Sequence, residues 1–273
     1  MQPEEPPLRI RAVDVGAQRL RISIRPGSGE GPPLLLCNGI GASIELVEPL
    51  VAALDGVETI AFDAPGVGGS PPPTLPYRFW NLACLVARLL DQLGYHEVDA
   101  LGVSWGGGLA QQFALQYPGR CRKLILAATS AGALMVPGRL SVISKLLSPR
   151  RYFDPSYMAR IAPEIYGGEY RQNPDLGRSY AYERKSMQPD RLGYFYQLFA
   201  AIGWTSLPWL PLLRQPTLVL AGSDDPIAPV INARILASLI PQAQLHIVNS
   251  GHLFLVTRAQ EVAPIIKQFL RRG

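Results

Sequence analysis

The chain has 273 residues, of which 48% are hydrophobic and 17% are charged, so it can form a buried core and is not intrinsically disordered. Its length favours one large domain, and no apolar run reaches the ~20 residues that a membrane-spanning helix needs. The net charge is +5, but the basic residues are scattered and accompany no nucleic-acid-binding motif, which argues against nucleic-acid binding.

The beginning of the chain and its cysteines indicate the compartment. The first ten residues, MQPEEPPLRI, hold two glutamates and three prolines where a secretory signal needs a basic start and an apolar stretch. Cys37, Cys84 and Cys121 are an odd number with apolar neighbours, so we expect small buried thiols rather than disulfides or a metal site. Both patterns favour a cytoplasmic protein.

Short apolar segments alternate with helical patterns along most of the chain. Residues 8–15 and 19–27 predict a β-hairpin. Further strands are expected at 34–37, 58–63, 98–103, 123–129, 216–222 and 244–248, and helices at 45–54, 79–93, 105–116, 232–239 and 258–271. Because these strands are apolar throughout and alternate with helices, they indicate an α/β fold with a mostly parallel sheet and helices on both faces.

The alternation stops near residue 131 and resumes near residue 216. The interruption falls between one strand and the next, so it predicts an inserted, mainly helical cap at residues 132–210. The remaining parts, 1–131 and 211–273, would form one core. The expected cap holds 13 of the 23 aromatic residues and +4 of the net charge.

Residues 102–106 (GVSWG) lie where an apolar strand meets a helical pattern. This is the GxSxG spacing of a nucleophile elbow, a sharp turn that projects a serine hydroxyl at the carboxyl edge of a sheet. The small flanking residues let neighbouring backbone pass close to the turn. GxSxG alone is a weak signal, and the strand–turn–helix context gives it specificity. Ser104 is therefore the candidate nucleophile.

A serine nucleophile needs a base to remove its proton and a carboxylate to orient that base. Of the three histidines, His252 directly follows the last expected strand, in a loop at the edge where functional groups gather. We expect His252 to be the base. His96 precedes the strand that leads to the serine, and His246 lies within an expected strand, so we expect both to be structural or exposed.

Two sites compete for the orienting acid. Asp224 and Asp225 follow the strand at 216–222, and we prefer Asp225, with Asp224 as a loop-capping carboxylate. Asp63 also lies at a strand end. The chain order serine, acid, histidine of α/β-hydrolases excludes Asp63 if that fold is correct.

Ester cleavage also needs hydrogen-bond donors for the oxyanion of the tetrahedral intermediate. The segment CNGIG at 37–41 follows the first core strand, so we expect the backbone amides of Ile40 and Trp105 to serve. Gly66, Gly68 and Gly69, in DAPGVGGS, have neither the lysine nor the spacing of a phosphate loop. We expect a structural turn there.

These residues resemble the α/β-hydrolase family over essentially the full chain. More narrowly, NGIGASIELVEP, FDAPGVGGS, GVSWGGGLAQQFA, RCRKLILAATSAG, RRYFDPS, QLFAAIGWTS, LVLAGSDDP and GHLFLVTRA resemble intracellular depolymerases of medium-chain-length poly(3-hydroxyalkanoates). The resemblance implies a triad of Ser104, Asp225 and His252, no metal or organic cofactor, and a cytoplasmic location at polyester granules. Many hydrolases have His-Gly where this chain has Asn38-Gly39, so the role of Asn38, a candidate substrate contact, stays open.

The resemblance also implies a polyester or granule surface as the partner, with the oligomeric state left open. Such a substrate requires an apolar pocket and a means of docking at the polymer surface. Candidates for the cap surface or pocket wall are Phe195, Tyr196, Phe199, Trp204 and Trp209. Alternatively, these aromatic residues fill the cap's own core. Other functions that stay open are a carboxylesterase, lipase or carbon–carbon bond hydrolase, and a noncatalytic granule-binding protein.

Overall fold

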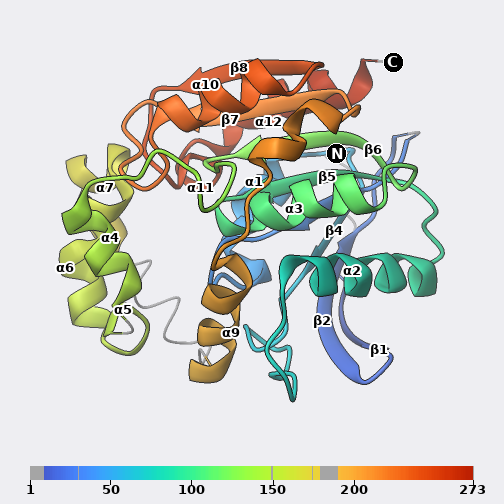
Figure 1. Cartoon of the computed structure of the whole chain (residues 1–273), viewed down its shortest axis with the longest axis horizontal. Helices are drawn as coiled ribbons and strands as arrows, with labels where there is room; N and C mark the ends of the chain where they lie inside the picture. The colour runs from blue at the N-terminus through green and yellow to red at the C-terminus, as the bar shows by residue number, and fades with distance from the viewer. Residues whose placement is uncertain (1–8, 30, 149, 174, 179–189, 273) are drawn as a thin grey trace, which may run out of the picture.

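A computed structural model describes residues 9–29, 31–148, 150–173, 175–178 and 190–272 (Figure 1). The expectation about the start of the chain rests on residues 1–8, which lie outside the described residues. The same holds for positions 149, 174 and 179–189 of the expected cap. Within the described ranges, no helix has the length and apolar character needed to cross a membrane.

The described strands form one eight-stranded sheet in the order β1-β2-β4-β3-β5-β6-β7-β8. They are β1 Arg9–Val15, β2 Gln18–Arg25, β3 Leu34–Cys37, β4 Thr59–Phe62, β5 Val98–Val103, β6 Cys121–Ala127, β7 Thr217–Gly222 and β8 Ala243–Val248. β1 pairs antiparallel with β2, and β2 with β4, while the other neighbours are parallel. The predicted hairpin and mostly parallel sheet are confirmed.

Helices cover both faces of the sheet (Figure 1). One face packs against α2 Phe79–Leu93, α3 Trp105–Gln116 and α10 Val230–Leu239. The other packs against η1 Ile44–Val47, α1 Glu48–Ala53, α11 Phe254–Thr257 and α12 Ala259–Arg271. Burial on both faces explains why the central strands are mostly apolar.

The edge strand β8 differs from the expected pattern of burial on both faces. Its residues 244–247 are exposed, and only Val248 is fully buried. β8 pairs with β7 alone and ends the sheet, so solvent reaches its side chains. His246 is one of these exposed residues.

Other differences from the predicted elements and burial are small. β6 begins at Cys121 and ends at Ala127, two residues earlier than predicted. The helix expected at 45–54 is split into η1 and α1, and the short helix α11 was not predicted. Cys84 is only partly buried, contrary to expectation, and its Sγ accepts a hydrogen bond from the Tyr117 hydroxyl at 3.2 Å.

Residues 132–210, between β6 and β7, are here called the inserted segment. Its described helices are α4 Leu140–Leu147, α5 Arg150–Phe153, α6 Pro155–Tyr166, α7 Gly168–Gln172, α9 Arg191–Ala201 and η2 Leu207–Leu212. Helices α4 to α7 gather at one end of the sheet (Figure 1), and α9 contacts them where the Tyr194 hydroxyl donates to the Leu146 carbonyl at 2.9 Å. Val142, Met158, Ile161 and Tyr166 form part of a separate small core. A β-bridge between Gly132 and Thr205 brings the two ends of the segment together.

Candidate active site

Ser104 occupies a strained turn between β5 and α3. Its backbone φ is +54°, a conformation that costs a non-glycine residue about 1–3 kcal/mol. The two flanking glycines permit the turn, because a Cβ on Gly106 would lie 2.0 Å from the Cys37 carbonyl oxygen. A Cβ on Gly102 would lie 2.4 Å from the carbonyl oxygen of Gly106. The GxSxG spacing therefore reflects close backbone packing that holds the hydroxyl at the carboxyl edge of β5.

The structure brings together Ser104, His252 and Asp225 from three distant parts of the chain. His252 Nε2 lies 3.1 Å from Ser104 Oγ, and His252 Nδ1 lies 2.7 Å from Asp225 Oδ2. The imidazole and the carboxylate are both buried, with side chains 4% and 0% exposed. These distances form a continuous hydrogen-bonded relay from hydroxyl to carboxylate, the arrangement that activates a serine.

The loop after β7 fixes the orientation of Asp225. Its Oδ1 accepts hydrogen bonds from the backbone N–H groups of Ile227 and Ala228, each at 2.9 Å. The other oxygen, Oδ2, therefore remains directed at the imidazole. Asp224 takes a different role, because its carboxylate accepts from the Gly168 N–H at 2.8 Å and pairs with Arg171.

The inserted segment supports the loop that carries His252. The His252 N–H donates to the Tyr166 carbonyl at 2.7 Å. Glu169 of α7 accepts from Ser250 Oγ at 2.6 Å, from Thr257 Oγ1 at 3.0 Å and from Arg258 Nε at 2.5 Å. Burial alone would raise the pKa of Glu169, but these hydrogen bonds outweigh it and hold the pKa below its ordinary value.

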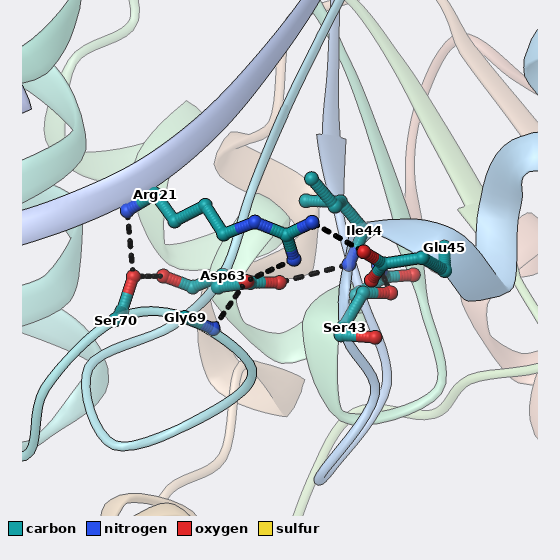
Figure 2. A network of polar contacts seen from close by, with 8 residues as sticks. Arg21, Ser43, Ile44, Glu45, Asp63, Gly69 and Ser70 are labelled. Atoms are coloured by element: carbon teal, nitrogen blue, oxygen red, sulfur yellow. Dashed lines mark hydrogen bonds and ion pairs between the residues drawn. The ribbon is translucent and has the colours of Figure 1, made fainter. Parts of the chain in front are cut away.

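Asp63 has a structural role, which Figure 2 shows. It is fully buried, and its carboxylate accepts from the backbone N–H of Ile44 at 2.8 Å, from that of Gly69 at 2.9 Å and from Arg21 at 3.1 Å. Arg21 also pairs with Glu45. Burial raises the pKa of Asp63, although these donors oppose the shift. The glycine-rich turn thus surrounds a carboxylate of the protein itself.

The β3–η1 loop, residues 38–43, lies beside the elbow. A Cβ on Gly39 would be 3.6 Å from Ser104 Cβ. Asn38 is buried, and its Nδ2 donates to the Ser43 carbonyl at 2.8 Å, so its side chain closes this loop. Ile40 lies in the same loop. Trp105 is the first residue of α3, and the first backbone N–H groups of a helix have no acceptor within the helix.

An apolar cavity of about 360 Å³ opens beside Ser104. Its wall includes Phe79, Gly132, Met135, Ala201, Trp204 and Ile227. Trp204 is held by a hydrogen bond from its Nε1 to Gln112 Oε1 at 2.9 Å and packs against the Phe79 ring. Trp204 is thus the aromatic candidate that the fold brings to the serine.

The other aromatic candidates lie elsewhere. Phe195 and Phe199 are 50% and 38% exposed on α9, and Trp209 is 54% exposed on η2. The Arg78 guanidinium lies 4.0 Å from the centre of the Phe199 ring. Tyr196 packs edge-on against Tyr77. These aromatic residues are not members of the small core of α4, α6 and α7, which is built from other side chains.

Known proteins share this architecture. Residues 32–259 match the family described as alpha/beta hydrolase fold, and the chain belongs to this family. An enol-lactonase from Burkholderia xenovorans LB400 superimposes with a TM-score of 0.83 at 23% identity, covering 96% of this chain and 100% of its own. A meta-cleavage product hydrolase from Pseudomonas fluorescens IP01 gives 0.80 at 20% identity, over 95% and 96% of the two chains.

A much more similar relative is the poly(3-hydroxyalkanoate) depolymerase of Ectopseudomonas oleovorans. It is 56% identical over 267 residues, which cover 97% of this chain and 94% of the relative. The match therefore extends through the sheet and the inserted segment alike, whereas the two structural neighbours support the fold alone.

Two further residues at the site escaped sequence reasoning. Gln197 and Glu169 carry no local motif, and the groups they bind lie 81 to 156 residues away in the chain. The one signal that could have indicated Gln197 is a polar residue at a core-facing position of its helical pattern. Without the fold, that signal does not indicate a partner.

Proposed function

We propose that this chain is a serine hydrolase that cleaves the ester bonds of poly(3-hydroxyalkanoate), preferring polymers with medium-length alkyl side chains. The relay from Ser104 through His252 to Asp225 supports the chemistry. The observation that carries the substrate is the 56% identity to a poly(3-hydroxyalkanoate) depolymerase over nearly the whole chain. The apolar cavity beside the serine suits an alkyl-substituted acyl group.

The proposed reaction has two acyl-transfer steps. Ser104 Oγ attacks the ester carbonyl carbon while His252 Nε2 accepts its proton, and the tetrahedral intermediate places its oxyanion near the backbone N–H groups of Ile40 and Trp105. Its collapse breaks the ester bond, and His252 returns the proton to the departing hydroxyl end of the polymer. Water, deprotonated by His252, then attacks the acyl-enzyme carbonyl carbon. The bond from that carbon to Ser104 Oγ breaks, His252 returns the proton to the serine oxygen, and a 3-hydroxy acid end is released. Asp225 orients the ring and stabilises its cation.

Within this proposal, residues 132–210 act as a cap over the site. Trp204 forms part of the acyl pocket. The exposed rings of Phe195, Phe199 and Trp209 would contact the surface of a polymer granule, where aromatic side chains supply apolar area at little cost in rotamer entropy. The protein would then work in the cytoplasm at granules.

The test uses purified protein on emulsified poly(3-hydroxyoctanoate), beside poly(3-hydroxybutyrate), a triglyceride and p-nitrophenyl octanoate. We expect clearance of the octanoate polymer, and loss of all ester cleavage by a factor of 10³ or more in Ser104→Ala. Turnover of the soluble ester without polymer clearance would instead indicate a carboxylesterase. Absence of Ser104 labelling by an organophosphonate would favour a noncatalytic granule-binding protein.

A further inference from the structure

The β3–η1 loop contributes one of the two proposed oxyanion donors, and its conformation is fixed at its ends. Asn38 bonds to Ser43 across the loop. The following residue, Ile44, donates its N–H to the buried Asp63 carboxylate (Figure 2). The first contact lies within the loop and the second joins it to the residue after β4, so both hold the loop independently of the inserted segment.

The middle of the loop has a contact of another kind. The Gly41 N–H, next to Ile40, donates to Gln197 Oε1 at 2.6 Å. Gln197 lies on α9 of the inserted segment and is only 1% exposed. The bond is part-buried, with its acceptor end shielded from solvent, so replacing the Gln197 amide takes this acceptor away from the Gly41 N–H.

Gln197 also contacts the residue that carries the other proposed donor. Its backbone carbonyl accepts a hydrogen bond from Trp105 Nε1 at 2.8 Å. A single residue of α9 therefore bonds to the loop beside Ile40 and to the side chain of Trp105. The two proposed oxyanion amides come from separate elements of the core, and Gln197 connects those elements.

Helix α9 is itself closely seated on the core. Gly193, one turn before Gln197, packs against Gly66, and a Cβ on Gly193 would lie 1.9 Å from the Gly66 carbonyl oxygen. The side chain of Asp190 caps the helix by accepting from the N–H groups of Leu192 and Gly193. The close packing of Gly193 on Gly66 leaves little freedom for α9 to shift along the core, and it therefore fixes the position of Gln197 as well.

We propose that Gln197 is a positioning residue through which the inserted segment aligns the oxyanion donors with Ser104. The proposal rests on the proposed function, because the donors have their role only if Ser104 forms a tetrahedral intermediate. Within the described part of the chain, the hydrogen bonds of Gln197 go to Gly41 and Trp105, which flank or carry the proposed donors. We therefore expect its substitution to weaken stabilisation of the transition state and not binding of the ground state.

The experiment compares wild type with Gln197→Met, which keeps the length of the side chain and removes the amide acceptor. The substrate is soluble p-nitrophenyl octanoate. Loss of one oxyanion donor lowers kcat by about 10²–10³ in well-studied enzymes, so misalignment should lower it by roughly 10-fold or more. KM should stay within about twofold, since the interaction lost is one of the transition state.

The inhibition constant of a transition-state analogue tests the positioning role, because a purely structural role of Gln197 would leave that constant unchanged. Ser104 adds to the carbonyl of an alkyl trifluoromethyl ketone, His252 takes the serine proton, and the resulting hemiketal oxyanion faces the same donors. The inhibition constant of the ketone should rise by the same factor by which kcat/KM falls. An unchanged inhibition constant in Gln197→Met would overturn the proposal.

Gln215→Met is the matched control. Gln215 is likewise buried, precedes β7 and donates to the Ala114 carbonyl at 3.1 Å, away from the serine. Its substitution should reduce stability while leaving kcat and the ketone constant unchanged, and equal losses in both variants would contradict the proposal.

If Gln197→Met does not fold, Gly193→Ala provides the test, because it displaces α9 and keeps the acceptor. It should lower kcat and ketone affinity together, and wild-type values would overturn the proposal. These results can be distinguished from a failure of the proposed function itself. Failure of the wild type on polymer refutes the substrate alone, and wild-type rates of ester cleavage by Ser104→Ala refute the mechanism.

Discussion

The buried carboxylate of Asp63 offers the sharpest test of how the core holds the site. In Asp63→Asn, the side chain keeps its size but has one acceptor oxygen in place of two. The native oxygens face three donors, the Ile44 N–H on one side and the Gly69 N–H and Arg21 on the other. Whichever way the amide turns, its own N–H₂ group must face a donor.

The expected loss follows from these contacts. Removing one partner of a buried ion pair costs about 3–5 kcal/mol in other proteins. Here Arg21 keeps its pairing with Glu45, so we expect the lower end, about 3 kcal/mol. That is a large part of the ~5–15 kcal/mol by which a domain is typically stable.

Urea unfolding, followed by fluorescence, measures the change. Glu45→Gln is the matched control, because it removes the other carboxylate from the same guanidinium. The Glu45 side chain is 32% exposed, so its loss should cost about 1 kcal/mol or less. If Asp63→Asn destabilises the protein no more than Glu45→Gln does, the reasoning about buried donors is wrong.

Two further predictions concern the inserted segment. Because the pKa of Glu169 is lowered in the folded protein, its stabilising effect is present above the ordinary glutamate pKa and disappears as the pH falls through the lowered value. The difference in free energy of unfolding between wild type and Glu169→Gln should therefore be greatest near neutral pH and shrink below pH about 4, and a difference independent of pH would contradict this. Trp209→Ala should slow clearance of polymer emulsion more than cleavage of a soluble ester, since the ring is exposed on η2, and equal losses would indicate a packing role.

Much of the core could be predicted from the sequence because its signals are local. The helices at 79–93 and 105–116 and the strands at 34–37 and 98–103 have the predicted bounds. The GxSxG spacing identified Ser104, since close packing at Gly106 leaves no alternative to glycine there. The order of residues along the chain then separated Asp225 from Asp63.

The remaining features depend on contacts between distant parts of the chain. Cys84 is partly exposed and bonds to Tyr117 of a different element, and β8 is exposed because it lies at the sheet edge. Similarly, the sequence does not show which aromatic residues of 132–210 line the pocket and which are exposed. Only the fold separates Trp204, which lines the cavity, from Trp209, which faces solvent.

The contacts made by the inserted segment bear on how such hydrolases can be recombined. The Tyr166 carbonyl and Glu169 hold the histidine loop, and Gln197 holds the β3–η1 loop. A chimera that receives this stretch from another family member must also supply equivalent acceptors at these three points. Otherwise, given the proposed roles of these residues, we expect the recipient to keep its nucleophile, acid and base in sequence but to lose their alignment. Transplanting this segment should then change substrate range and turnover together.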